Sequence, residues 1–346
     1  MDVNNEFDLT FDIILPTYNG SAWVSATIIS IISQSFNNYR ILIQDDASTD
    51  NTEDVIKSFK DQRIFFEKNT KNVGYSKNME ILRQKTIADI IYLMGQDDIL
   101  GADALLNTYK VFKNNPEVGA VTRPYFWFNK DVSMPVRAKV QMNAYTDEII
   151  TMNDPQEKII DVFSTLDQLS GLAFRREFVD MPFHEDIFPC HVYPFASIMK
   201  NHPVVMLKDY NVAVRIASSQ CRFVSSIYNK SPILSWFELF ENVFNDEKFN
   251  KFREGMIKKF VAINYVGLIQ IRNYSTYKNL LREIYYLIKF RNKNLVDFRF
   301  WFFSLGTMLV PSIILIPMIE VFKNKINSLR LKGIKFKYEC SYDWKG

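Results

Sequence analysis

Two adjacent carboxylates, Asp97 and Asp98, directly follow an apolar run at residues 90–94. Such a run predicts a buried strand, which Gly95 ends. Open α/β sheets bind their ligands at the carboxyl ends of their strands. Two acids at that edge suit a hard divalent cation that holds a diphosphate. The alternative is a solvent-exposed turn, in which aspartate is also common.

Three other polar loops follow predicted strands in the first half of the chain. The strands are expected at residues 11–15, 39–43 and 64–67, and the loops are Pro16-Thr17-Tyr18-Asn19, residues 45–52 and Asn72-Val73-Gly74. In a parallel sheet these loops meet residues 95–98 at one edge. Tyr18 would offer an aromatic face there, and Asp45 and Asp46 would accept hydrogen bonds from a base and from ribose hydroxyls. This composition suits a nucleoside diphosphate that carries a further group.

The elements that must position these loops alternate along the chain. Helices are expected between and after the strands, at residues 22–34, 53–60, 76–84 and 102–114. Strands that alternate with helices predict the α/β class, with a mostly parallel sheet flanked by helices. Shorter strands are expected at 118–121, 126–128, 204–207 and 212–216, and helices at 154–163 and 193–200. Beyond Trp236 the chain is predicted to be helical, aromatic and basic.

The C-terminal part differs from the rest in charge. Residues 251–346 hold 18 Lys and Arg against 6 Asp and Glu, whereas the remainder holds 24 basic and 33 acidic residues. Within this basic part, residues 300–319 carry no charge and are long enough to span a bilayer, although Pro311 and Pro317 argue against one straight helix. We expect a helical hairpin that lies in the membrane interface first, a transmembrane span second and a buried core helix third, because the basic flanks favour membrane contact over the core. Nucleic acid is not an expected partner, because the basic residues interleave with the apolar segment.

Several common enzyme classes lack their signatures in this sequence. The glycine spacing excludes a G-x-G-x-x-G fingerprint, and no P-loop, H-E-x-x-H or G-x-S-x-G motif occurs. The absence of these motifs argues against a dehydrogenase, a kinase or a hydrolase. Three scattered cysteines indicate neither a zinc site nor disulfides. The acidic, polar N-terminus is not a secretory signal, so a cytosolic compartment is expected.

Three segments, in this order, resemble the family 2 glycosyltransferases. They are Asp12-Ile13-Ile14-Leu15-Pro16-Thr17-Tyr18-Asn19, Ser33-Gln34-Ser35-Phe36 and Asp45-Asp46-Ala47-Ser48-Thr49-Asp50-Asn51-Thr52. Asn72-Val73-Gly74 with Ser76-Lys77-Asn78 is similar to the family's N-x-G…(R/K)-N segment. The resemblance covers residues 11–216 and implies the Rossmann-like GT-A fold and a nucleotide-sugar donor. It also implies a domain over residues 1–220, with a nucleotide-sugar half at 1–121 and an acceptor half at 122–220, before a helical region at 221–346.

The resemblance also assigns site residues. Pro16, Tyr18 and Asp46 match positions that line the nucleoside site, and Lys77 matches a basic position near the diphosphate. Asp98 matches the acid that binds Mn²⁺ or Mg²⁺, with Asp97 beside it near the sugar or ribose. Gly95 stands where the family often has the first acid of D-x-D-D, so Asp98 must carry most of the metal binding. The whole set expected to bind the donor is Pro16, Thr17, Tyr18, Asn19, Asp45, Asp46, Asn72, Gly74, Lys77, Gln96 and Asp97.

The sequence offers three candidates for the catalytic base. Inverting members of the family carry a Glu-Asp pair about a dozen residues before the position of Asn201-His202, but residues 189–191 hold no carboxylate. Glu185 and Asp186 form an acidic pair displaced by a few residues. His191 lies nearest the expected position and has an ordinary pKa close to neutral. Chemistry favours Asp186, and spacing favours His191.

Together these features predict an inverting glycosyltransferase. It would move a sugar, with a UDP-sugar as the first expectation, to a hydroxyl of a saccharide or lipid-linked saccharide in cell-surface polysaccharide synthesis. Its expected place is the cytoplasmic face of the membrane, peripheral or monotopic. The alternative is a catalytically inactive, nucleotide-sugar-binding scaffold of the same fold, because the first acid is missing and the base is displaced.

Overall fold

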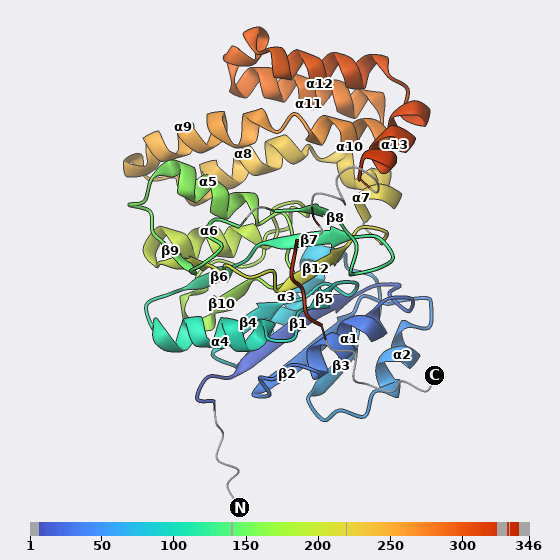
Figure 1. Cartoon of the computed structure of the whole chain (residues 1–346), viewed down its shortest axis with the longest axis vertical. Coiled ribbons are helices and arrows are strands. Elements are labelled where there is room, and N and C mark those ends of the chain that lie inside the picture. The colour runs from blue at the N-terminus through green and yellow to red at the C-terminus, as the bar shows by residue number, and fades with distance from the viewer. Residues whose placement is uncertain (1–6, 140, 219, 324–330, 332, 339–346) are drawn as a thin grey trace, which may run out of the picture.

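The computed structural model describes residues 7–139, 141–218, 220–323, 331 and 333–338. An α/β part lies at one end of the long axis, and helices are stacked on it at the other end (Figure 1). The chain begins in the α/β part, and the helices from α8 onward form the opposite end.

The main sheet has eight strands in the order β3-β2-β1-β4-β10-β6-β11-β9. Its parallel half contains β1 (Phe11–Thr17), β2 (Tyr39–Asp45), β3 (Ile64–Lys68) and β4 (Ile90–Leu93). Every residue of β1 and β4 is buried, as expected of parallel strands covered on both faces. Thr17 pairs with Asp45, and Ile14 pairs with Leu93, so these strands end near one edge.

Helices follow the first strands as the sequence predicts. They are α1 (Val24–Ile32), α2 (Thr52–Ser58), α3 (Tyr75–Gln84) and α4 (Ala104–Asn114). One boundary prediction was wrong: β1 continues through Pro16 instead of stopping before it. Its pairing with β4 ends at Ile14, so Pro16 lies where β1 has a neighbour on one side only.

The second half of the α/β part adds a second sheet and two helices. The second sheet has the order β5-β12-β7-β8. Neither the two-residue β5 nor β8 and β9 were predicted. The elements are β5 (Ile99–Leu100), β6 (Ala120–Thr122), β7 (Tyr125–Phe128), β8 (Pro135–Ala138), β9 (Glu148–Ile150), α5 (Gln156–Ser164), β10 (Ala173–Arg175), η1 (Arg176–Phe178), α6 (Val192–Asn201), β11 (Val204–Met206) and β12 (Val212–Arg215).

After β12, the regular elements that the structure describes are helical. Phe163 of α5 packs on Phe240 of α8, with ring centroids 5.1 Å apart, and one hydrophobic core extends from the main sheet into this region. The elements are α7 (Gln220–Phe223), η2 (Ser225–Asn229), α8 (Pro232–Val243), η3 (Glu247–Phe249), α9 (Asn250–Lys259), η4 (Val261–Ile263), α10 (Gly267–Tyr274), α11 (Tyr277–Phe290), η5 (Asn292–Val296), α12 (Phe298–Leu309) and α13 (Ser312–Val321).

The uncharged segment at residues 300–319 is divided between two helices. Helix α12 ends at Leu309 and α13 begins after Pro311, because a proline cannot continue the hydrogen-bond ladder. Within the described ranges, none of the helices is long and apolar enough to cross a bilayer. Both helices leave large apolar side chains exposed, at Phe298, Trp301, Phe302, Leu305, Leu309, Ile313, Ile314, Met318, Val321 and Phe322.

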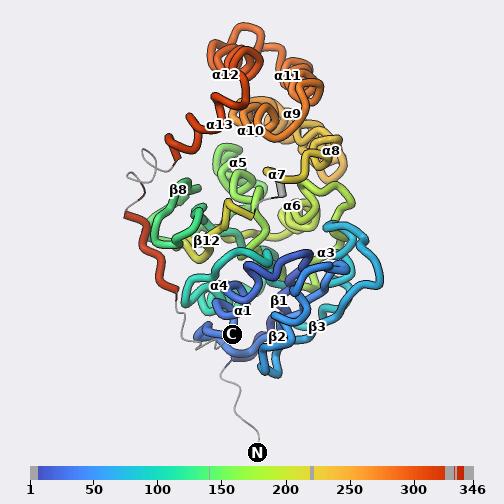
Figure 2. Tube along the Cα trace, turned by 90° about the vertical axis from the view of Figure 1, so that its right-hand side faces the viewer, coloured from blue at the N-terminus to red at the C-terminus, as the bar shows by residue number. Residues whose placement is uncertain are grey.

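Residues 333–338 return to the α/β part. The Phe336 ring packs against Phe126 of β7 at 5.0 Å, and the Lys337 carbonyl accepts a 2.8 Å hydrogen bond from the Ala102 amide. Figure 2 shows this red segment running down one side of the molecule, between β8 and α4. The end of the described chain therefore packs on the second sheet, far from the helices that precede it.

Candidate active site

Four loops meet at the carboxyl edge of β1 to β4. We call them the four-loop edge: residues 16–20, 45–52, 69–74 and 95–98. The Gln96 side chain links two of them, because its Oε1 accepts from the Tyr18 amide (2.9 Å) and its Nε2 donates to the Tyr18 carbonyl (3.0 Å). A Cβ on Gly20 would lie 2.3 Å from Gln96 Oε1, so any other residue here would force the Gln96 side chain to move. Gln96 thus positions the Tyr18 loop.

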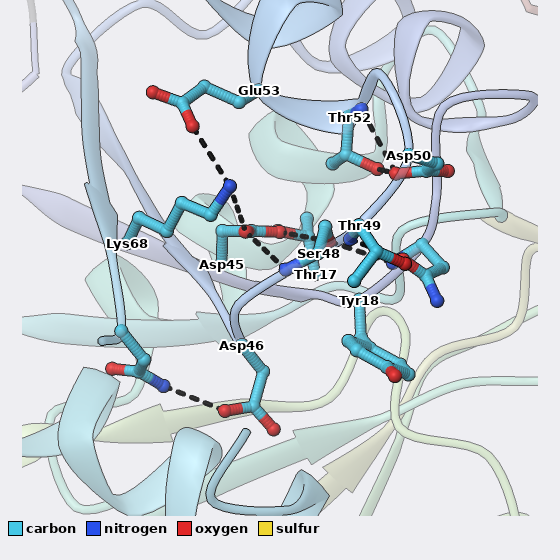
Figure 3. A network of polar contacts seen from close by, with 12 residues as sticks. Thr17, Tyr18, Asp45, Asp46, Ser48, Thr49, Asp50, Thr52, Glu53 and Lys68 are labelled. Carbon is cyan, nitrogen blue, oxygen red and sulfur yellow. Dashed lines mark hydrogen bonds and ion pairs between the residues drawn. The ribbon is translucent and has the colours of Figure 1, made fainter. Parts of the chain in front are cut away.

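Asp45 is buried inside the second loop. Its carboxylate accepts from Thr17 Oγ1 (3.0 Å), the Ser48 amide (2.9 Å) and Ser48 Oγ (2.5 Å), while Lys68 lies 3.9 Å away (Figure 3). The protein itself therefore satisfies this carboxylate. Asp45 fixes the shape of the loop and joins it to the end of β1.

Asp46 joins the second loop to the third. It accepts from Asn69 Nδ2 (2.8 Å) and from the amides of Val73 (2.8 Å) and Gly74 (2.9 Å). Gly74 has φ of +88°, a conformation that favours glycine. In Figure 3 the Asp46 side chain and the Tyr18 ring extend to the same side, away from the contacts of Asp45. The Tyr18 ring is 38% exposed, so its aromatic surface is open to a ligand.

The remaining predicted donor residues occupy the same edge. Asn19 has φ of +46°, donates its amide to Ser48 Oγ (2.8 Å) and accepts from the Thr49 amide (2.9 Å). Asn72 Oδ1 accepts from the Gly74 amide at 3.1 Å. Lys77 is exposed on the first turn of α3, and none of the described residues forms an ion pair with it. It is therefore an available positive charge beside the loops.

Asp98 is the buried acid at this edge, with an exposed fraction of 4%. Its Oδ1 accepts from the Arg215 amide (2.9 Å), and its Oδ2 accepts from Ser170 Oγ (2.5 Å). Ser170 Oγ in turn accepts from the Gly95 amide at 2.8 Å. Burial, with the neighbouring charge of Asp97, raises the pKa of Asp98 to about 7. Ser170 and Arg215 therefore belong to this site, although neither was among the residues expected to bind the donor.

Asp97 and Arg215 complete this corner. The Asp97 carboxylate accepts from Ser218 Oγ, and burial raises its pKa. Arg215 Nε donates to the Asp97 carbonyl (3.2 Å), and its guanidinium carbon lies 4.6 Å from both the Trp23 and the Phe128 ring centroids. The half-buried Asp97 and the buried Asp98 thus lie beside one cation that is held between aromatic rings.

The acid pair fits a divalent cation on the chemistry of its donors. Two neighbouring carboxylates with raised pKa values are costly in the ionised form, and a cation would offset that cost. No cluster of three His, Cys, Asp or Glu side chains suited to a metal occurs in the described part of the chain. Mg²⁺ is commonly held by one or two carboxylates, with water and substrate phosphates as the other ligands. Asp97 and Asp98 match that pattern.

Gly95 lies close against the acid pair and leaves little room for a side chain. A Cβ there would lie 3.1 Å from Asp98 Oδ2 and 3.2 Å from Ser170 Oγ. A side chain at this position would therefore be directed at the same corner. The family's missing first acid would have stood next to Asp98.

The three base candidates have different environments. His191 is buried, its Nε2 lies 2.8 Å from the Leu166 carbonyl, and burial lowers its pKa to about 4, so the ring is neutral at pH 7. Its Nδ1 is buried without a hydrogen-bond partner among the described residues. The Asp186 side chain is fully buried and forms a 2.8 Å ion pair with Lys230. Glu185 is exposed.

Residues 12–177 match the family model described as glycosyl transferase family 2. This part of the chain is a family 2 glycosyltransferase domain. The matched range contains all four loops, the acid pair and Ser170. The family match therefore includes the loops that follow each of the first four strands.

Curated proteins resemble this chain in sequence over part of its length. Over 132 residues it is 28% identical to the UDP-Glc:alpha-D-GlcNAc-diphosphoundecaprenol beta-1,3-glucosyltransferase WfgD of Escherichia coli, covering 34% of this chain and 52% of that enzyme. The chain spans about half the length of such curated relatives or less.

Solved structures share the fold at low identity. The S. aureus TarS 1-349 structure has a TM-score of 0.63 at 13% identity, with 91% of both chains covered, and the same protein is known in complex with UDP-GlcNAc. The mannosyltransferase PcManGT of Pyrobaculum calidifontis, in complex with GDP-Man and Mn²⁺, has a TM-score of 0.53 at 13% identity, covering 95% of this chain and 85% of that one. At this identity the likeness shows the fold alone.

Proposed function

We propose that this protein is an inverting glycosyltransferase that moves a sugar from a UDP-sugar to a hydroxyl of a saccharide or lipid-linked saccharide acceptor. The observation that carries the proposal is the four-loop edge, where an exposed Tyr18, a free Lys77 and the acid pair Asp97 and Asp98 lie on loops that meet. The UDP-Glc in the name of WfgD and the UDP-GlcNAc in complex with TarS support uridine as the nucleoside.

Each donor residue then has a physical task. The Tyr18 ring offers a face on which the base can stack, and Asp46 holds the wall of that pocket through its contacts with residues 69–74. Pro16, Thr17 and Asn19 shape the same wall, and Asp45 keeps the loop in place. Lys77 and Arg215 bring positive charge to the diphosphate.

Asp98, assisted by Asp97, would hold Mn²⁺ or Mg²⁺. The ion supplies charge neutralisation for the diphosphate that leaves. Ser170 and the Arg215 amide orient the two Asp98 oxygens, so the acid is fixed before the donor arrives. The Mn²⁺ complex of PcManGT supports a metal-dependent assignment.

We assign the base to Asp186 rather than His191 or Glu185. Asp186 is a carboxyl group paired with a lysine, whereas His191 has a lowered pKa, and its Nε2 lies within hydrogen-bond distance of the Leu166 carbonyl. In the reaction the base takes the proton of the acceptor hydroxyl, and the hydroxyl oxygen bonds to the anomeric carbon. The nucleoside diphosphate leaves from the opposite face with the bonding electron pair, so the configuration inverts.

The surface of α12 and α13 supports a membrane-bound acceptor. Their exposed apolar side chains lie in a region with an excess of basic residues, a combination that binds anionic bilayers. We therefore place the protein on the cytoplasmic face of the membrane, with residues 1–121 binding the donor, 122–220 the acceptor and 221–346 the bilayer.

The test is donor turnover. Purified protein should hydrolyse or transfer from UDP-sugars only with Mn²⁺ or Mg²⁺ present, and UDP with metal should raise its melting temperature. The missing first acid at Gly95 favours one rival, an inactive nucleotide-sugar-binding scaffold. Stabilisation by UDP with no turnover over a broad donor and acceptor screen would establish the scaffold and exclude the enzyme.

A further inference from the structure

A cluster of cations lies between the second sheet and α13, outside the donor site. Its members are Arg137 on β8, Arg222 on α7 and Lys323, just after α13. Both views of the molecule place α13 next to β8 (Figures 1 and 2). Burial lowers the pKa of Lys323, and the positive charges of Arg222 and Arg137 lower it further. Three segments far apart in sequence thus bring like charges close to each other.

The cluster has too few acids to balance it. Glu320 is shared between Arg222 (3.1 Å) and Lys323 (3.5 Å). Lys139 lies beside Arg137, since both cations stand over the Trp127 ring, and it pairs with Asp167 at 3.1 Å. Arg137 has no ion pair among the described residues. Four cations against two carboxylates leave a local excess of two positive charges.

Arg137 is exposed but lies against an aromatic ring, whereas Arg222 and Lys323 are partly removed from water. The Arg137 guanidinium lies 4.3 Å from the Trp127 ring centroid. The Arg222 and Lys323 side chains are only 16% and 21% exposed. Like charges that are partly desolvated repel each other unless an anion binds between them. Arginines held in this way suit phosphate oxygens, which they bind with two parallel hydrogen bonds.

The surroundings indicate which phosphate the cluster would meet. On one side Lys323 directly follows Phe322 and the exposed apolar side chains of α13. On the other side Asp167 lies three residues before Ser170, whose hydroxyl binds Asp98. The cluster therefore lies between an apolar surface and the corner where the sugar is to be transferred.

We propose that Arg137, Arg222 and Lys323 bind the phosphate or diphosphate of a lipid-linked acceptor, with its lipid chain along α13 and its sugar towards Asp98. This deepens and rests on the proposed glycosyltransferase function. The shared chemistry is a lipid phosphate, and a phospholipid head group is the competing source.

The probe is farnesyl diphosphate, titrated calorimetrically into the full chain saturated with UDP and Mn²⁺, so that the donor site is filled. The double variant R137Q/K323Q should lower the affinity at least tenfold. The matched control K278Q/K289Q removes two exposed charges from α11 and should stay within twofold of wild type. E320Q removes the competing carboxylate and should tighten binding. Unchanged melting temperatures would show that the variants are folded.

Several results would overturn the proposal. They are equal losses in both double variants, farnesol or inorganic pyrophosphate binding as tightly as farnesyl diphosphate, and competition by phosphatidylglycerol vesicles at equal phosphate concentration. The last result would assign the cluster to lipid head groups. Failure of the proposed function is seen separately, because the wild type would then turn over no UDP-sugar, whereas the farnesyl diphosphate titration measures binding alone.

Discussion

The four-loop edge and the loop before α6 both hold buried polar groups, but the partners of these groups come from different places. At the four-loop edge, Asp45 and Asp46 are satisfied by residues that lie within the same three motifs, at Thr17, Ser48 and residues 69–74. Before α6, His191 contacts the Leu166 carbonyl and Asp186 pairs with Lys230 from the helical region. The proposed donor site is thus built from local motifs, whereas the proposed base depends on remote parts of the chain.

At the four-loop edge, the largest effect is expected from the variant Asp98→Asn. The change removes the charge that would hold the metal, while the amide oxygen can still accept from the Arg215 amide and the NH₂ group can donate to Ser170 Oγ. We expect turnover to fall by about 10³-fold or more, and the stabilisation by UDP to become independent of Mn²⁺. Initial rates and melting temperatures, with and without metal, measure this. Metal-dependent turnover near the wild-type rate would remove Asp98 from the metal site.

On the other side of the comparison, Asp186→Asn tests the base. Loss of a general base should lower kcat by about 10²–10⁴-fold and leave UDP affinity unchanged. Lys230→Met is the companion variant, because it removes the partner and keeps the carboxylate. Full activity in Asp186→Asn would transfer the role to His191 or Glu185.

The buried His191 should make the free energy of unfolding depend on pH. Its pKa is about 4 in the folded protein and about 6.5 when unfolded, so the unfolded chain binds more protons between these values. Stability is therefore full above pH 6.5 and declines as the pH falls towards 4, by at most about 3 kcal/mol from this group. Urea unfolding of wild type and His191→Gln at pH 7 and pH 4.5 measures the difference. A variant with the same decline as wild type would contradict the assigned pKa.

The smallest effect is expected from Gly20→Ala. The new methyl group would meet Gln96 Oε1 at 2.3 Å and push the side chain away from Tyr18. We expect a loss of about 1–3 kcal/mol in stability and weaker UDP binding. The double variant Gly20→Ala/Gln96→Ala should recover part of the stability, since the clash is gone. Additive losses in this cycle would show that Gly20 and Gln96 act independently.

The same contrast explains what could be predicted from the sequence. Alternating strands and helices, with motifs at their junctions, predicted β1 to β4, α1 to α4 and the convergence of the loops, because these depend on neighbouring residues. Ser170, Arg215 and Ser218 were missed as contacts of the acid pair, since they reach it from 72 to 121 residues away in the chain. The division of 300–319 into two helices followed from Pro311, but which of its side chains stay exposed depended on packing.

The packing of α5 on the helical region has a mechanical consequence. Phe163 of α5 packs on Phe240 of α8, and Gln156 Nε2 of the same helix donates to the Phe252 carbonyl of α9 at 2.9 Å. A body fastened at two separate points resists swinging about either one. The opening of the proposed active site should therefore keep a fixed height and tilt above any bilayer on which α12 and α13 rest.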